Sequence, residues 1–190
     1  MKSRIMNLLS NRQRVALSDP NFNHAAVFLL LFERDGEYYI LFTKRSNELK
    51  FHKGQISFPG GGFDEDDVNL LNTAFREVFE ELGLTREEIE VLGELDDVVT
   101  FTSKYIITPF VGLLKHPPNG RLKINKYEIE KVIEVPLFAL LDNRNFREEL
   151  HEYYGRKVPI YFYDYNGYVI WGATAMILKQ FLDLLKTKNN

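Results

Sequence analysis

The stretch that decides the fold runs from residue 60 to residue 84 and reads GGGFDEDDVNLLNTAFREVFEELGL. It opens on three consecutive glycines, which no helix interior would accept, so Gly60–Gly62 is predicted to be a loop. Apolar residues then recur at helical spacing up to Leu82, and Gly83 stands where helices commonly end on a left-handed glycine. We therefore predict a glycine loop followed by a helix from about Asn69 to Leu82.

Three glutamates, Glu77, Glu80 and Glu81, share the side of this helix opposite its apolar face, because successive residues turn by about 100°. Carboxylates one turn apart repel one another and cost stability unless a positive charge lies between them. Magnesium takes oxygen ligands, and it commonly combines one or two protein carboxylates with phosphate oxygens of a substrate. This face therefore suits a metal bound together with a phosphate compound. The alternative is an ordinary solvated helix surface, on which glutamate is common.

The wider pattern favours the metal site, because it resembles the Nudix box. That box is a glycine turn and an acid, followed by Arg-Glu, an apolar residue, any residue, Glu-Glu, any residue, Gly and an apolar residue. The segment from Arg76 to Leu84 matches every fixed position. In the first half we take Gly61 and Asp67 as the matching residues, although one extra residue separates Asp67 from Arg76. Asp67 would also suit the N-cap of the helix.

The resemblance implies a role for each matched residue and a divalent cofactor, Mg²⁺ or Mn²⁺. Glu77 and Glu81 would be the principal metal ligands, and Glu80 would be a further or water-mediated ligand. The carbonyl oxygen of Gly61 would be another ligand, and Arg76 would be structural. Glu77, Glu80 and Glu81 are thereby also the expected catalytic residues.

The residues just before the glycines narrow the resemblance to one branch of that family. LFTKRS at 41–46, then Lys50, Gly54 and FPGG at 58–61, looks like the signature of the coenzyme A pyrophosphatase branch. Phe42 replaces the usual leucine, and Lys50 replaces an arginine. The second change matters more, because arginine binds phosphate through a bidentate fork and lysine only as a point charge. The resemblance implies hydrolysis of coenzyme A or a derivative to 3',5'-ADP and 4'-phosphopantetheine or its acylated form.

A dense basic cluster lies in the same stretch, beside the glycines that should face the metal. Its members are Lys44, Arg45, Lys50, His52 and Lys53. We expect about half of them to contact the 3'-phosphate and diphosphate of the substrate, and the leading candidates are Lys44, Arg45, Lys50 and His52. The alternative is that some merely decorate a strand end and a loop. For His52 we favour a role as phosphate donor or as a hydrogen-bonding residue of the loop.

A general base should accompany the metal ligands. Members of the resembled family often carry one on a loop or strand end after the box, and Glu128, eight residues before Pro136, is the best match. Its alternative role is an exposed strand acid. Three rivals are Glu94, Asp96 and Asp97.

The remaining pattern predicts a mixed or antiparallel sheet. Asp35-Gly36 and Asn166-Gly167 are strong hairpin turns between alternating apolar runs. The expected strands are 25–32, 37–43, 89–92, 106–113, 131–135, 158–165 and 168–171, with a short amphipathic helix over 1–15 and a closing helix at 173–185. The fold class is α+β, and the resemblance implies a Nudix-type α/β/α sandwich with a mixed central sheet and the Nudix loop-helix-loop.

We expect one domain over residues 1–190: an N-terminal helix and linker at 1–22, the Nudix core at 24–142, and a C-terminal hairpin and helix at 143–190. With a net charge of −3 and a pI near 5.9, the chain has no overall positive field that would attract nucleic acid or an anionic membrane. The chain lacks cysteine and any unbroken apolar span, so we expect a cytoplasmic protein with a small-molecule nucleotide substrate of the coenzyme A type. The sequence leaves the oligomeric state open, with a homodimer as one option. The aromatic residues of the C-terminal segment suit the core, the wall of a substrate pocket or a subunit contact.

Two other functions compete with coenzyme A hydrolysis. One is the same chemistry on ADP-ribose, a dinucleotide or a modified nucleoside triphosphate. The other is a domain of the same fold that senses a nucleotide without turnover, because fold alone does not imply catalysis. The intact glutamate set argues against the second.

Overall fold

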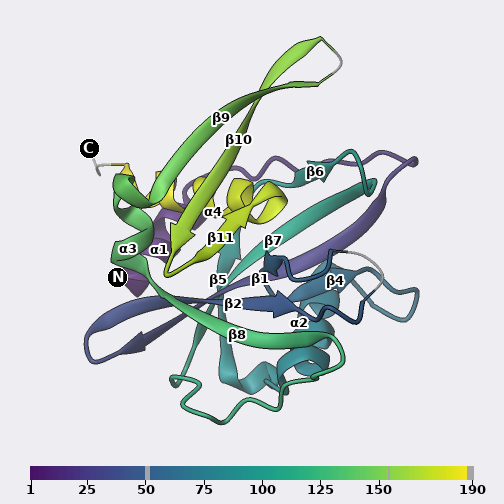
Figure 1. The fold of residues 1–190 in the computed structure, drawn as a ribbon. Helices are drawn as coiled ribbons and strands as arrows, with labels where there is room; N and C mark the ends of the chain where they lie inside the picture. The colour runs from purple at the N-terminus through teal and green to yellow at the C-terminus, as the bar shows by residue number, and fades with distance from the viewer. Residues whose placement is uncertain (50–51, 154, 188–190) are drawn as a thin grey trace.

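The computed structural model describes residues 1–49, 52–153 and 155–187 of the chain, and these residues form a mixed eight-stranded sheet at the centre of the molecule (Figure 1). β1 and β7 are parallel neighbours, whereas every other pairing in this sheet is antiparallel, which confirms the predicted mixed sheet. The strands are β1 (Asn23–Arg34), β2 (Glu37–Arg45), β3 (Ile56–Ser57), β4 (Gly60–Gly62), β5 (Ile89–Glu94), β6 (Val98–Thr100), β7 (Tyr105–Leu114) and β8 (Ile129–Pro136).

The hairpin between β1 and β2 forms at the predicted turn. Asp35 and Gly36 both have positive φ, 53° and 81°, as a two-residue turn that matches the strand twist requires. The strands are longer than predicted, because pairing continues over polar ends that carry no apolar alternation. Asn166 and Gly167 repeat the same geometry, with φ of 47° and 80°, in the second hairpin.

β1 and β2 separate beyond their paired region, and Gly60–Gly62 lie between them. Register between β1 and β2 ends at Leu30 opposite Leu41. Past that point β3 pairs with β2, and β4 pairs antiparallel with β1, so that Gly61 lies opposite Ala26. The prediction of a loop for Gly60–Gly62 was therefore wrong. Glycine disfavours strands in general, but a Cβ on Gly60 would come within 2.3 Å of the Ala26 carbonyl oxygen, so only glycine allows this approach.

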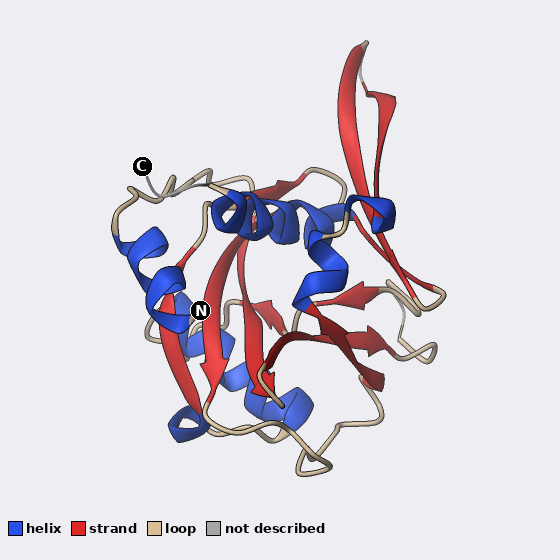
Figure 2. Ribbon diagram, turned by 90° about the vertical axis from the view of Figure 1, so that its left-hand side faces the viewer, coloured by secondary structure: helices blue, strands red, loops and turns tan. Residues whose placement is uncertain are grey.

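Helices cover both faces of the sheet, giving the predicted three-layer arrangement (Figure 2). α2 (Leu70–Leu82) packs Ala74, Val78 and Leu82 on one face. α1 (Lys2–Ser10) and α4 (Gly172–Lys186) lie on the other face, within a second apolar cluster. α3 (Leu137–Leu141) follows β8 directly, and two short 3-10 helices span Arg86–Glu88 and Asn143–Asn145. Among the described residues, no helix combines the length and apolar composition needed to cross a bilayer.

α2 begins and ends as its sequence predicts. The Asn69 side chain accepts a hydrogen bond from the Asn72 N–H at 2.9 Å, and Gly83 adopts the left-handed conformation at φ 69°. Asp67 is therefore not the N-cap, contrary to one of its two predicted roles.

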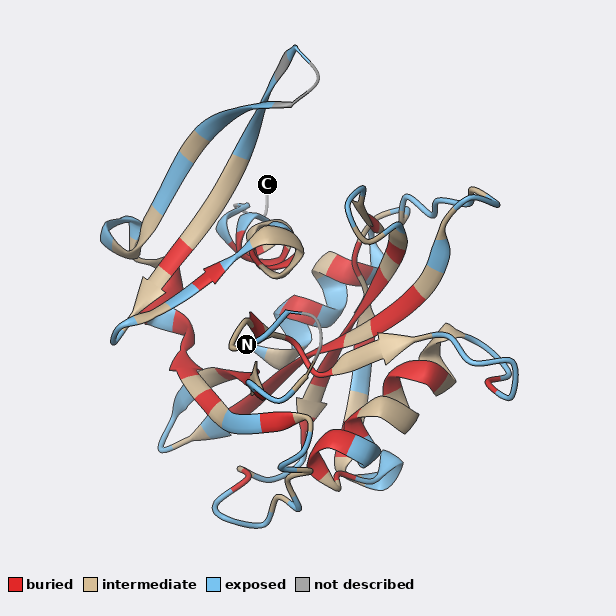
Figure 3. Ribbon diagram, turned by 45° about the vertical axis from the view of Figure 1, so that its right-hand side comes forward, coloured by how far each residue is buried: buried red, intermediate tan, exposed pale blue. Residues whose placement is uncertain are grey.

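A smaller sheet of three strands lies beside α4. It contains β9 (Phe146–Tyr153), β10 (Arg156–Tyr165) and β11 (Tyr168–Trp171), and the distal part of the β9–β10 hairpin extends away from the body with largely exposed residues (Figure 3). The hairpin between β10 and β11 was predicted, but β9 was not. Four charged residues and a histidine interrupt its apolar pattern, so only its pairing with β10 identifies it as a strand.

Candidate active site

The carboxylate of Glu77 lies against the backbone of Gly61. A Cβ placed on Gly61 would be 2.5 Å from the Glu77 carboxylate carbon, which is far inside van der Waals contact. Gly61 is held there by strand pairing with Ala26, and Glu77 by the helix that packs on β4. The second and third turns of α2 are thereby brought beside the glycines.

Glu81 lies one turn further along α2 and is almost fully buried, with 2% of its surface exposed. The Gly60 backbone N–H favours the ionised form of its carboxylate and so lowers the pKa of Glu81, against the larger effect of burial. The carboxylate oxygen Oε2 is buried and has no hydrogen-bond partner among the described residues. A buried carboxylate oxygen without a donor is costly and calls for a ligand that the protein itself does not supply.

The electrostatics of the two carboxylates point to a cation. Burial raises the pKa of Glu81 to about 8, and the charge of Glu77 adds to the shift. Burial also raises the pKa of Glu77, against the opposing effect of Arg76. Two carboxylates that repel each other in a poorly solvated site become stable as anions when a divalent ion lies between them. The donor set, the unpartnered Oε2 and the close approach of Glu77 to the Gly61 backbone therefore fit a hard divalent cation.

Arg76 ties the glycine strand, the loop after it and the helix together. Its Nε and Nη2 donate to the two oxygens of Asp67 at 3.1 and 2.9 Å, and Nη2 also donates to the Gly62 carbonyl at 2.9 Å. Nη1 donates to Glu77 Oε1 at 2.9 Å. Arg76 lowers the pKa of Asp67 to about 2, so this pair stays ionised. Arg76 is structural as the resemblance implies, and Asp67 serves as its partner.

Glu80 lies apart from the other two helix acids. Its side chain is half exposed, and it contacts Arg76 Nη1 at 3.3 Å instead of facing the glycines. In the positions that the described side chains adopt, no three acidic or histidine side chains form a complete metal-binding group. Glu77 and Glu81 are the two of the predicted helix ligands that the structure brings to Gly60 and Gly61.

Glu128 reaches the same place from the start of β8. Its negative charge contributes, after larger causes, to the raised pKa of both Glu77 and Glu81. The Glu128 carbonyl accepts a hydrogen bond from the Ser46 N–H at 2.7 Å, which fixes its backbone to the end of β2. The segment just before β8 therefore places Glu128 where its charge acts on the two helix acids.

The three rival acids are occupied elsewhere. Arg14 pairs with Glu94 at 2.5 Å and with Asp97 at 2.7 Å, and Arg12 pairs with Asp96. These contacts fasten the segment after α1 to the turn between β5 and β6. The predicted amphipathic helix over 1–15 is accordingly shorter than expected, because Arg12 and Arg14 hold this segment in an extended path.

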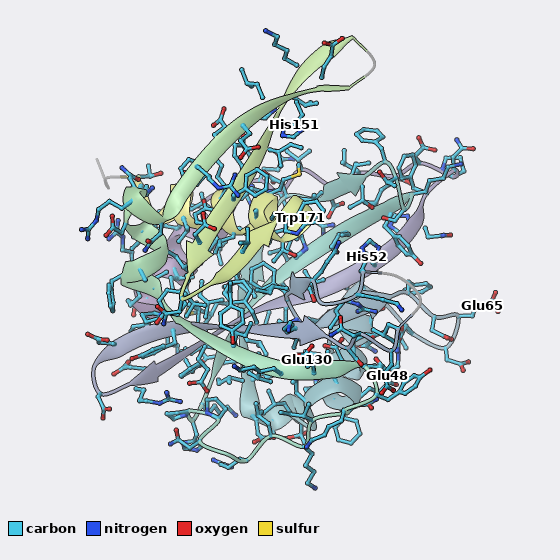
Figure 4. The ribbon with its side chains drawn as sticks, in the orientation of Figure 1. Glu48, His52, Glu65, Glu130, His151 and Trp171 are labelled. Carbon is cyan, nitrogen blue, oxygen red and sulfur yellow. The ribbon has the colours of Figure 1, made fainter. Side chains whose placement is uncertain are left out.

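The predicted basic cluster divides into separate environments. Lys44 Nζ pairs with Glu130 Oε1 on β8 at 2.7 Å, so its charge is largely compensated. His52 shares a hydrogen bond of 2.9 Å with Gln55 in an exposed loop, and Figure 4 shows it well away from Glu130. Lys53 is exposed in that loop, and Lys50 lies outside the described residues.

Among the described members of the cluster, Arg45 is the one whose charge acts on Glu81. Its charge opposes the rise in the pKa of Glu81, so the guanidinium lies near that carboxylate. Its Nε is buried without a hydrogen-bond partner among the described residues. Arg45 is thus available to an anion held beside Glu81.

The family comparison agrees with this geometry. A family model described as NUDIX domain matches residues 22–155, which include β1, the glycine strand, α2 and β8. This chain belongs to the NUDIX domain family. It is a Nudix hydrolase, and enzymes of this family act on nucleoside diphosphate-linked substrates and generally use divalent ions such as Mg²⁺ or Mn²⁺.

Relatives with curated names support the same family. The chain is 38% identical over 164 residues to a protein of Photorhabdus laumondii named uncharacterized Nudix hydrolase NudL, covering 86% of this chain and 85% of that one. It is also 38% identical over 161 residues to the mitochondrial Nudix hydrolase 15 of Arabidopsis thaliana, covering 81% of this chain and 55% of that longer protein. The chain thus spans little more than half of the plant relative.

A solved structure supports the fold. The MutT/nudix family protein of Enterococcus faecalis superposes with a TM-score of 0.56 at 14% identity, covering 97% of this chain and 70% of the other. At that identity the likeness concerns the fold alone, and it confirms the Nudix-type sandwich with its mixed central sheet.

Proposed function

We propose that this Nudix hydrolase cleaves the diphosphate bond of coenzyme A or its derivatives, releasing 3',5'-ADP and 4'-phosphopantetheine or its acylated form. The main support for the hydrolytic site is that Glu77 and Glu81 converge on the backbone of Gly60 and Gly61. The coenzyme A assignment rests on the LFTKRS and FPGG motifs, which surround this site as the end of β2 and the approach to β4.

Each residue has a role in the proposed reaction. Glu77 and Glu81, with the Gly61 carbonyl, would hold Mg²⁺ or Mn²⁺, and Glu80 would contribute through water or through Arg76. When bound, the metal supplies charge neutralisation on the diphosphate and lowers the pKa of a coordinated water. Arg76 restrains Glu77 and the glycine strand, so the ligands need little reorganisation.

The proposed chemistry is a simple hydrolysis. The oxygen of a water attacks one phosphorus in line, the bond from that phosphorus to the bridging oxygen breaks, and the second phosphate leaves with the bridging oxygen. Glu128 accepts the water proton as general base. Arg45, with its unpartnered Nε, would bind a substrate phosphate beside Glu81.

The basic cluster contributes less to this proposal than the sequence motif alone suggests. Lys44 retains a role if substrate phosphate displaces Glu130, and His52 and Lys50 stay candidate phosphate contacts. Arg45 is the strongest of the four, because it combines burial with a free donor near the acids.

A substrate panel tests the proposal. Coenzyme A, acetyl-coenzyme A, ADP-ribose, a diadenosine polyphosphate and nucleoside triphosphates would each be incubated with the protein and Mg²⁺ or Mn²⁺, and the products separated by chromatography. We expect the highest kcat/KM for a coenzyme A compound, with 3',5'-ADP as product. A higher kcat/KM for ADP-ribose or another nucleotide would overturn the substrate assignment but keep the hydrolase. Binding of nucleotide with no turnover of any compound would favour the sensing function.

A further inference from the structure

Asn125 connects the candidate general base to the helix that carries the candidate metal ligands. Its backbone N–H donates to the Glu81 carbonyl oxygen at 2.9 Å, near the end of α2. Its own carbonyl oxygen accepts hydrogen bonds from the N–H groups of Glu128 and Ile129, at 3.1 and 2.8 Å. Asn125 therefore joins two segments whose relative position sets the distance between Glu128 and Glu81.

The side chain of Asn125 acts on the Glu128 carboxylate itself. The amide Nδ2 donates to Glu128 Oε1 at 3.2 Å, while Oδ1 accepts from the Tyr127 N–H at 3.2 Å. The turn is thus held through one atom of the amide, and the carboxylate is oriented through the other. Both Asn125 and Glu128 are partly buried, so solvent competes less for this hydrogen bond than at an open surface.

Orientation matters because only one oxygen of the carboxylate is engaged. Oε1 is occupied by the amide, which leaves Oε2 as the atom able to accept a proton from water. Without the amide the Glu128 side chain would gain rotamers in which neither oxygen faces the site, and a small displacement of a reacting group lowers rate strongly.

We propose that Asn125 is a positioning residue for hydrolysis, which holds Glu128 Oε1 so that Oε2 faces the water to be deprotonated. This inference rests on the proposed function, since it needs Glu128 to act as base. A carboxamide at this position supplies the donor that an aspartate of the same shape lacks.

The test separates the two halves of the Asn125 amide. Asn125→Asp keeps the acceptor for Tyr127 but removes the donor to Glu128, whereas Asn125→Ala removes both. With whichever panel substrate is turned over fastest, we expect each variant to lower kcat roughly tenfold, with KM changed less than about twofold. If Asn125 only shaped the turn, the Asn125→Asp variant would have the kcat of the parent. That result would overturn the inference.

A double-mutant cycle shows whether the effect passes through Glu128. Glu128→Gln should lower kcat by about a hundredfold or more, and Asn125→Asp should cost nothing further in that background. An equal loss from Asn125→Asp with and without Glu128 would overturn the inference, because the added charge would then act on the metal ligands directly. Asn143→Asp is the matched control, since Asn143 is exposed and the only hydrogen bond of its side chain among the described residues is a long one from Lys186. It should leave kcat unchanged.

Failure of this inference differs from failure of the proposed function. If Glu128→Gln hydrolyses as fast as the parent, Glu128 is not the base and Asn125 positions nothing. If Glu81→Gln still abolishes turnover in the same assay, the proposed hydrolytic site remains supported, but Glu128 and Asn125 are not part of it.

Discussion

Glu77 and Gly61 lie so close that the site depends on the missing side chain of the glycine: a Cβ there would be 2.5 Å from both the carboxylate carbon and Oε1 of Glu77. Only a residue without Cβ lets the carboxylate rest against the backbone. Glu77, the proposed metal ligand on α2, thus packs directly against the backbone of β4.

Gly61→Ala should therefore damage catalysis more than folding. The methyl group would push the flexible Glu77 carboxylate aside, while the backbone could keep its pairing with Ala26. We expect kcat/KM to fall by about a hundredfold with a modest drop in Tm. Gly62→Ala is the matched control, because a Cβ there would meet only the Tyr105 ring, at 3.8 Å or more. Equal activity losses in both variants would contradict the role of the Gly61 contact.

The three helix glutamates should differ in importance. Glu77 and Glu81 face the glycines, but Glu80 is half exposed on Arg76. We expect Glu77→Gln and Glu81→Gln to lose at least about a hundredfold in kcat, and Glu80→Gln about tenfold. Activity at saturating Mg²⁺ and metal affinity measured by calorimetry provide the comparison. A Glu80→Gln variant as inactive as Glu81→Gln would show that Glu80 turns inward when the metal binds.

The metal-free protein should lose stability as the pH rises. The pKa of Glu81 is raised by burial from 4.5 to about 8, so the folded state favours the protonated carboxyl. Its contribution is fully present below about pH 4.5 and is lost as the pH approaches 8. With chelator present, Tm should fall across this window, and Glu81→Gln should remove that part of the fall. Saturating Mg²⁺ should raise Tm most at the alkaline end, because binding requires the ionised carboxylate. A flat difference between parent and variant would contradict the assignment.

Asp67→Asn should weaken the link between the glycine strand and α2. The Asp67 side chain is 6% exposed and pairs with Arg76 through two hydrogen bonds. Its pKa is lowered from 3.8 to about 2, so the pair stabilises the fold above about pH 3.8 and is lost as the pH falls toward 2. We expect the variant to unfold in urea with a free energy lower by about 2 kcal/mol at pH 7. Asp66→Asn, at the exposed neighbouring position, should change it little.

Local sequence determined the helix and the turns of this protein. The apolar spacing from Leu70 to Leu82, the capping residues Asn69 and Gly83, and the two hairpin dipeptides each lie within a few contiguous residues. Such signals act through backbone conformation and helix periodicity, so they need no distant partner. The spacing of Glu77 and Glu81 likewise placed both on one helix face.

Tertiary structure decided what those local elements meet. Gly60–Gly62 became a strand because β1 and β2 diverge and leave backbone groups unpaired between them, and Glu128 reached Glu81 through a turn held by Asn125. Lys44 pairs with Glu130, 86 positions away, instead of remaining a free cation. These outcomes depend on strand register and on charges brought together across the chain, and no run of neighbouring residues encodes either.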